Sequence, residues 1–195
     1  MSKPPFVRGD RLDLVPLSRE HAPLLEKWEN DMEVLHYWGQ QPFPRGLRNI
    51  EETLDKLYER KDSLIVGIQL KDGRLIGSGG LSYIEWPWRR AELSMCIGEK
   101  GQQGHGYGRE ATRLILAHAF SRLNLHSVML RVISYNKRAI RCYVACGFKP
   151  AGKRRESRMD GTRYYDVLLM DILDREFNPA MKTTFKRRDA KRKRE

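Results

Sequence analysis

The spacing of apolar and polar residues divides the chain into short strands and helices. Alternation of the two kinds predicts a half-buried strand at 11–17, whereas apolar residues three or four positions apart predict a helix at 47–60. Seven segments have the character of strands: 11–17, 63–70, 74–86, 89–98, 126–134, 148–158 and 162–173. Five have the character of helices: 18–30, 31–38, 47–60, 109–123 and 136–147.

The order of these elements predicts a mixed α/β (α+β) domain. Helices interrupt a mostly antiparallel run of strands, so we expect one sheet of six to seven strands with helices on both faces. A helix separates 89–98 from 126–134, and such a crossover allows these two strands to lie parallel. A ligand at the start of that helix would lie beside the strand ends.

Composition indicates one globular domain followed by a basic tail. The chain has 195 residues, 40% of them hydrophobic, and we expect the domain to span 1–181. The tail at 182–195 contains eight basic and two acidic residues, which is half of the net charge of +12. Because it lacks apolar periodicity, we expect it to be disordered. It is interpreted either as a solvated tail or as an arm that makes weak, salt-sensitive contacts with nucleic acid.

Membrane and secreted classes are disfavoured. No apolar run approaches the ~20 residues of a membrane span, and the N-terminus MSKPPFVRGD has no signal-peptide character. The three cysteines, Cys96, Cys142 and Cys146, are too few for a disulfide framework, so we expect a cytoplasmic protein. Cys142 and Cys146 have a spacing that could hold a metal, but no histidine pair lies nearby; packing is favoured and no metal is expected.

The most distinctive motif is a glycine-rich turn before the helix at 109–123. Four glycines fall within eight positions: Gly101, Gly104, Gly106 and Gly108. Glycines let backbone N–H groups converge, and the first turn of a helix adds unpaired donors and a positive dipole. The turn therefore predicts a phosphate site with Arg109 at its rim, although a purely structural tight turn is the alternative. Its spacing fits neither the dinucleotide-binding fingerprint nor the nucleotide-triphosphatase loop.

Two segments resemble the acetyl-CoA-binding segments of the GNAT N-acetyltransferase superfamily. QGHGYG fits the signature Q/R-x-x-G-x-G/A through Gln103, Gly106 and Gly108. The stretch 134–148 is similar to N-x-x-A-x-x-x-Y-x-x-x-G-F through a second set of residues: Asn136, Ala139, Tyr143, Gly147 and Phe148. The order of elements over about 8–175 resembles that fold, with a splayed parallel pair of strands. The chain most resembles the branch of ribosomal-protein N-terminal and polyamine (spermidine/spermine) acetyltransferases.

The resemblance implies that acetyl-CoA is the co-substrate. Backbone groups of the turn would hold the CoA pyrophosphate: Gln103, Gly104, His105, Gly106, Tyr107, Gly108 and Arg109. The end of the preceding strand would pair with the pantetheine arm, which has two amides and resembles a peptide; the residues concerned are Cys96, Ile97 and Gly98. Asn136 would hydrogen-bond the cofactor near its reactive end, and Ala139 belongs to the same segment.

Acetyl transfer to an amine needs a proton donor for the leaving thiolate and a base for the amine. Tyr143 is the predicted acid, the role that the family gives to this tyrosine; as an alternative, Tyr143 is a core residue. Glu92 is the candidate base, or else it forms an ion pair with Arg89, Arg90 or a neighbouring strand. By analogy with the family, a backbone N–H near 95–97 would stabilise the oxyanion.

Acidic and aromatic residues near the first helices are candidates for binding a cationic amine: Glu29, Asp31, Glu33 and Trp38. The alternative is a solvated helix face, and the aromatic stretch 83–90 is a further candidate lining. We expect an N-acetyltransferase that acts on a peptide N-terminus or a polyamine-like amine by direct attack in a ternary complex. A homodimer is possible. The alternative function is a nucleic-acid-associated protein with a non-catalytic CoA-binding domain.

Overall fold

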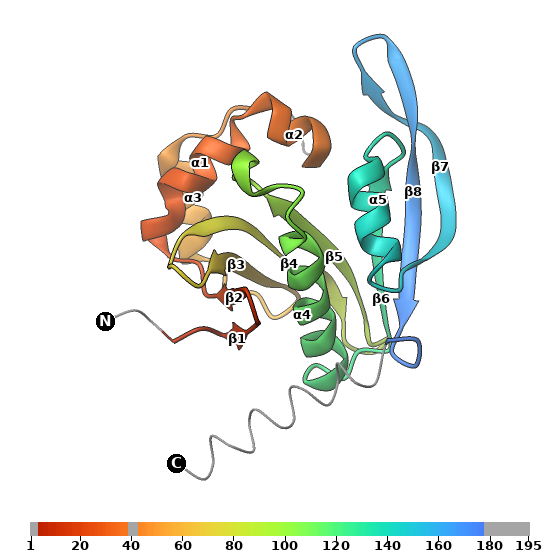
Figure 1. Cartoon of the computed structure of the whole chain (residues 1–195), viewed down its shortest axis with the longest axis horizontal. Helices are drawn as coiled ribbons and strands as arrows, with labels where there is room; N and C mark the ends of the chain where they lie inside the picture. Colours follow the sequence, from red (N-terminus) through yellow and green to blue (C-terminus); the bar gives the residue numbers. More distant parts are fainter. Residues whose placement is uncertain (1–3, 39–42, 178–195) are drawn as a thin grey trace.

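The structure is a computed structural model that describes residues 4–38 and 43–177. Within these residues the strands form one sheet in the order β1-β2-β3-β4-β5-β6-β8-β7 (Figure 1). Their bounds are β1 (Val7–Arg8), β2 (Leu12–Val15), β3 (Leu64–Leu70), β4 (Leu75–Glu85), β5 (Arg90–Ile97), β6 (Ser127–Ile133), β7 (Lys149–Asp160) and β8 (Arg163–Leu173). The α-helices are α1 (Ala22–Glu29), α2 (Met32–Trp38), α3 (Leu47–Asp55), α4 (Tyr107–Ser121) and α5 (Lys137–Val144), and the 3-10 turns are η1 (Arg19–His21) and η2 (Lys100–Gln102).

Apolar residues cover both faces of the sheet and form two cores. On β2, Leu12 and Leu14 belong to the larger core, which includes residues of α4 and α5, whereas Val15 belongs to the core formed with α1 and α3. On β5, Leu93 packs in the larger core and Cys96 packs against the other one. Because successive strand residues point to opposite faces, this alternation places the two helix groups on opposite sides of the sheet.

The sheet opens between β5 and β6. These two strands are the parallel pair among the described strands, and they pair only from Arg90 to Glu92 opposite Ser127 to Met129. Both strands continue for several residues beyond this short ladder. The remaining length of β5 therefore has a free edge on the side of β6.

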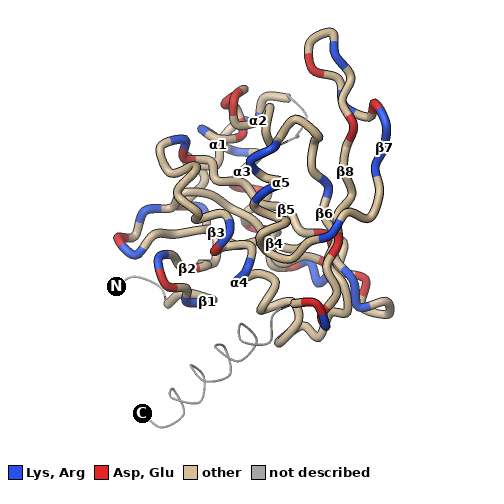
Figure 2. Tube along the Cα trace, turned by 45° about the vertical axis from the view of Figure 1, so that its right-hand side comes forward, with Lys and Arg blue, Asp and Glu red and all other residues tan. Residues whose placement is uncertain are grey.

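The strands beyond this opening form a less buried arm. β7 lies at the sheet edge, and every residue of it except Arg158 is exposed. The β7–β8 hairpin extends beyond α5 (Figure 1), and Figure 2 shows basic residues along β7. Charged residues on an exposed edge discourage pairing with other chains.

The fold class expected from the sequence is confirmed, with some local differences. β1, which pairs with β2 through Val7 and Arg8, adds one strand to the seven expected; two residues are too few to show alternation. α3 ends at Asp55 rather than at 60, and beyond it the Tyr58 hydroxyl accepts a hydrogen bond from the Leu17 N–H at 2.7 Å. The predicted tail at 182–195 lies outside the described residues, so its boundary stays a prediction.

Candidate functional site

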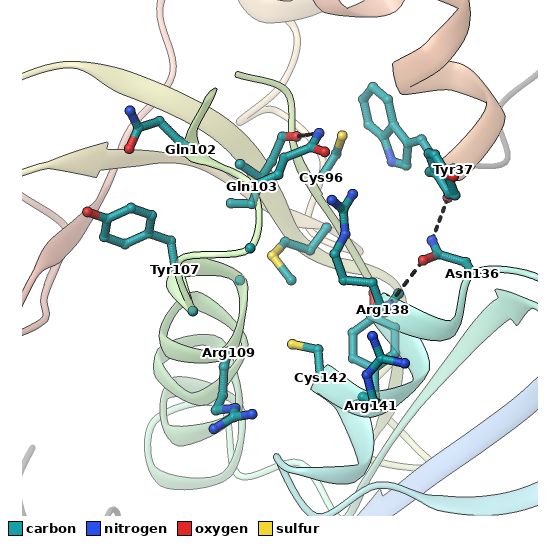
Figure 3. Close-up of a pocket in the computed structure, with 18 of the residues that line it drawn as sticks. Tyr37, Cys96, Gln102, Gln103, Tyr107, Arg109, Asn136, Arg138, Arg141 and Cys142 are labelled. Carbon is teal, nitrogen blue, oxygen red and sulfur yellow. Dashed lines mark hydrogen bonds between the residues drawn. The ribbon is translucent and has the colours of Figure 1, made fainter. Parts of the chain in front are cut away.

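A cavity of about 400 Å³ lies where β5 and β6 part. It is bordered by the end of β5, the glycine-rich turn, the start of α4, α5 and the last residues of α2 (Figure 3). Twelve of the predicted site residues line it: Trp38, Cys96, Ile97, Gln103, Gly104, Gly106, Tyr107, Gly108, Arg109, Asn136, Ala139 and Tyr143. The fold thus brings the two acetyl-CoA-like segments of the sequence to opposite sides of one cavity.

The glycine-rich turn has the backbone geometry expected of an anion site. Gly104 and Gly106 both have φ of 84°, a conformation that costs other residues about 1–2 kcal/mol. Gly106 is the N-cap of α4 and has no side chain to cap the helix, which leaves first-turn N–H groups open to an anion. The Gln103 side chain donates a hydrogen bond to Ile97 O at 2.8 Å and so ties the turn to the end of β5. This turn and the free edge of β5 fit a diphosphate followed by a peptide-like arm.

A basic residue from the start of the chain supports the turn. Arg11 donates hydrogen bonds to His105 O at 2.9 Å and to the Glu110 carboxylate at 3.0 Å. Its guanidinium lies 3.2 Å from the place where a Cβ on Gly106 would stand. Nothing in the sequence indicated this contact, because about 95 positions separate the two segments.

The opposite wall, formed by α5, contributes side chains. Asn136 is buried and accepts a hydrogen bond from the Ala139 N–H at 3.1 Å, while its amide donates to Tyr37 O at 3.0 Å. It therefore caps α5 and also ties α5 to the end of α2. Arg138 and Arg141 also line the cavity, and the Arg138 guanidinium lies 5.6 Å from the centre of the Tyr37 ring.

Tyr37 and Met95 line the cavity and lie in stretches that the sequence had indicated for the amine and the oxyanion. Five further lining residues were not predicted to belong to the site: Val34, Gln102, Arg138, Arg141 and Cys142. Helical spacing would have found some of them. Arg138, Arg141 and Cys142 occupy positions i, i+3 and i+4 of α5, so the three residues share one face of this helix.

Tyr143 is packed in the core and also lines the cavity, so the core position that the sequence offered as an alternative does not exclude contact with a ligand. Its side chain is 7% exposed and packs edge-on against Phe148, with ring centres 5.8 Å apart, and it also lines the cavity. Burial raises the pKa of Tyr143 above its ordinary value. The phenol thus stays protonated and able to donate.

Glu92 is not among the residues that line the cavity. Glu92 is the last residue of β5 that pairs with β6. Its carboxylate accepts a hydrogen bond from Arg131 Nε on β6 at 2.7 Å. This is the ion pair with a neighbouring strand that the sequence left open. Its role as a base stays a prediction.

The predicted acceptor carboxylates lie near one end of the cavity without lining it, and each has a cationic partner. Glu29 bonds to Arg45 at 2.8 Å, and burial raises its pKa. Lys100 Nζ lies 2.9 Å from the Asp31 carboxylate and 2.7 Å from that of Glu33. The hydrogen bond from Lys100 lowers the pKa of Asp31.

The other predicted residues lie outside the cavity lining. A Cβ on Gly98 would stand 2.2 Å from the Trp28 ring, so packing requires this glycine. His105 is exposed, and its Nδ1 lies 3.0 Å from Gln103 O. The stretch 83–90 comprises the end of β4, the β4–β5 turn and the first residue of β5, whereas the cavity contacts the other end of β5; its role in binding the acceptor stays a prediction.

The described part of the chain lacks two features. No group of three or more histidine, cysteine, aspartate or glutamate side chains is arranged to hold a metal ion. Nor does any described helix have the length and apolar character that a membrane crossing requires.

Comparisons with known proteins agree with this geometry. Residues 11–149 match the model of the acetyltransferase (GNAT) domain family. Spermidine N(1)-acetyltransferase of Vibrio cholerae serotype O1 is 29% identical over 170 residues, which is 87% of this chain and 96% of that protein. The putative ribosomal N-acetyltransferase YdaF of Bacillus subtilis is 26% identical over 137 residues, covering 69% of this chain and 74% of the relative.

A solved structure is similar over the same extent. Spermidine N-acetyltransferase from Vibrio cholerae, crystallised with CoA and spermine, superposes with a TM-score of 0.79 at 27% identity, covering 86% of this chain and 98% of that one. These findings confirm the enzyme class expected from the sequence, an N-acetyltransferase that uses acetyl-CoA, and give no support to the non-catalytic alternative. The chain belongs to the acetyltransferase (GNAT) domain family.

Proposed function

We propose that this N-acetyltransferase acetylates a primary amine of a polyamine of the spermidine class. The observation that carries the proposal is similarity over nearly the whole length of spermidine N(1)-acetyltransferases. The acidic residues beside α2 support it, since carboxylates and aromatic faces attract ammonium groups. Tyr37 and Trp38 line the adjoining end of the cavity.

The different walls of the cavity would have different roles in acetyl transfer. Acetyl-CoA supplies an activated acetyl thioester when bound. Backbone N–H groups at 104–109 would hold its diphosphate with Arg138 and Arg141, and the free edge of β5 at 95–97 would pair with its amides. A backbone N–H of that same edge would stabilise the oxyanion as the amine attacks.

Tyr143 would supply the proton that the departing thiolate needs. The phenol reaches the cavity from a buried position, and its raised pKa keeps it protonated, and so able to donate, until the thiolate forms beside it. The amine must lose a proton before it attacks, and the prediction that Glu92 accepts this proton requires Glu92 to act through water or to leave Arg131.

A peptide N-terminus is the second candidate acceptor. The acidic residues that would attract a polycation are already paired with Arg45 and Lys100 of this chain. A polyamine must therefore compete with these cations, whereas a peptide has a single ammonium to place. Similarity to a putative ribosomal N-acetyltransferase agrees with this second candidate.

An acceptor panel decides between them. Release of free thiol from acetyl-CoA is measured with spermidine, spermine, an aminoglycoside and short peptides with free N-termini. We expect the highest kcat/KM with spermidine or spermine. Efficient acetylation of peptides with no response to polyamines would overturn the proposal in favour of the second candidate.

Matched variants show whether the acidic residues bind the acceptor. The double variant Asp31→Asn/Glu33→Gln should raise KM for spermidine and leave the Kd of acetyl-CoA unchanged. Glu52→Gln on α3 removes an exposed carboxylate that pairs with Arg48 and is the control. Equal KM values in both variants would remove Asp31 and Glu33 from the acceptor site.

Two further predictions about partners are tested separately. Deleting 182–195 should abolish any weak RNA binding and leave acetyl transfer intact.

Light scattering tests the homodimer, and a mass of one chain at micromolar concentration would contradict it.

A further inference from the structure

Two of the three thiols of the chain form a contacting pair at the wall of the cavity. Cys142 lines the cavity, and Cys146, four residues later, is buried behind it. The Cys146 thiol donates a hydrogen bond to Arg109 O at 3.6 Å, and it adjoins Cys142 closely enough to lower the pKa of the Cys142 thiol. Both cysteines are free. In Figure 3 the Cys142 sulfur points from α5 toward α4.

The surroundings of Cys142 stabilise negative charge on its sulfur. The adjoining Cys146 thiol lowers the pKa of Cys142, and so do the cations Arg109 and Arg113 of α4. Thr112 of α4 is fully buried, its hydroxyl has no hydrogen-bond partner among the described residues, and it acts on the pKa of Cys142 in the same direction. Three residues of α4 and Cys146, which follows α5, thus act on one sulfur.

Cys96 shows that the environment of Cys142 is not a general property of the cavity. It also lines the cavity, from the end of β5. Burial raises the pKa of Cys96 to about 12, and the neighbouring carboxylate of Glu29 acts in the same direction. Two thiols therefore line one cavity, and only Cys142 is set up to be a nucleophile, because the thiolate is the reactive form.

We propose that Cys142 is a modification site for disulfides of coenzyme A, on the basis of its position in the cavity, the adjoining Cys146 and the converging cations. In the exchange, the Cys142 thiolate attacks one sulfur of CoA disulfide. A Cys142–CoA disulfide forms, the S–S bond of the reagent breaks, and one CoA leaves as its thiolate, so no further oxidant is needed. The groups that hold acetyl-CoA would hold the reagent too, and the attached CoA would block the cavity until a thiol reduces the bond.

This proposal rests on the proposed use of the cavity for acetyl-CoA, so binding is measured first. Calorimetric titration of the reduced full-length protein with acetyl-CoA tests the cavity by itself. Absence of binding refutes the proposed function, whereas binding without any later adduct refutes only the modification.

The modification is tested by incubating the reduced protein with CoA disulfide and measuring its intact mass and peptide map. We expect one CoA per chain, on Cys142, with prior saturation by acetyl-CoA preventing the reaction and dithiothreitol reversing it. CoA disulfide should react about tenfold faster than glutathione disulfide, because the phosphate site positions it. Equal rates, or a first adduct on Cys96 or Cys146, would overturn the proposal.

Three variants assign the sulfur. Cys142→Ser should abolish the adduct, whereas Cys96→Ser should still give one CoA per chain on Cys142. Cys146→Ala removes the adjoining thiol that lowers the pKa of Cys142 and should slow the exchange, since each unit of pKa changes the thiolate fraction about tenfold. Circular dichroism of each variant confirms folding, and an adduct that persists in folded Cys142→Ser would refute the assignment.

Discussion

The two walls of the cavity present different kinds of group. The wall formed by the end of β5, the turn and the start of α4 presents mainly backbone, including two glycines with φ of 84° and a strand edge without a partner. The wall formed by α5 presents side chains, among them a capping amide, two guanidinium groups and a buried phenol. The first wall is thus defined by its shape, and the second by its chemistry.

This difference determines how each wall responds to substitution. On the backbone wall a new side chain acts by strain or by occupying space, as at Gly106, where a Cβ would stand 3.2 Å from the Arg11 guanidinium. On the α5 wall a substitution removes a proton, a charge or a hydrogen bond without altering the chain path. Substitutions on the backbone wall should therefore change affinity or stability, and those on α5 should separate turnover from binding.

The largest effect is expected from Tyr143→Phe on the α5 wall. Phe keeps the packing against Phe148 and removes only the hydroxyl, and a general acid contributes a factor of about 10²–10⁴ to the rate. We expect kcat to fall by about that factor with little change in the Kd of acetyl-CoA, measured by thiol release and calorimetry. Tyr164→Phe, on the exposed hairpin, is the control. Wild-type turnover in Tyr143→Phe would show that Tyr143 is only a core residue.

The second effect concerns charge on the same wall. Arg138→Ala/Arg141→Ala removes two cations that line the cavity, and we expect a loss of about 2 kcal/mol, or roughly thirtyfold in the Kd of acetyl-CoA. Turnover at saturation should change far less. Lys137→Ala, in the same helix but outside the lining, is the matched control. If both variants bind acetyl-CoA equally well, the backbone wall alone holds the phosphates.

The sequence predicted the backbone wall more fully than the interactions around it. Glycines before a helix have few alternative explanations, because a φ of 84° at Gly106 excludes most other residues. Alternation likewise predicted the seven longer strands. The pairing of Glu29 with Arg45 and the support from Arg11 were not predicted, since both depend on tertiary contacts that leave no periodic pattern. For Glu92 the sequence offered two alternatives, and only the structure shows the ion pair with Arg131.

The third effect is a strain on the backbone wall. Gly106→Ala places a Cβ on a residue with positive φ, which costs about 1–2 kcal/mol. We expect the Kd of acetyl-CoA to rise by up to about thirtyfold as the turn relaxes, with kcat at saturation nearly unchanged. Gly101→Ala is the control, since its φ is not positive and a Cβ there meets nothing within 4 Å. Equal losses in the two variants would mean that flexibility of the whole turn, rather than the geometry at Gly106, governs binding.

The smallest effect tests the connection between the α5 wall and α2. Asn136→Ala removes the cap of α5 and the hydrogen bond to Tyr37 O, and loss of a cap costs about 1 kcal/mol of unfolding free energy, which urea denaturation measures. Asn136→Asp keeps an acceptor for the Ala139 N–H but cannot donate to Tyr37 O. Asp should therefore restore most of the unfolding free energy. KM for the amine should be higher than in the wild type in both variants, because both lose the hydrogen bond that holds α2, and α2 carries Tyr37 and Trp38 into the cavity. If Asp restores both quantities, Asn136 acts only as a helix cap, and the α5 wall holds its position without the tie to α2.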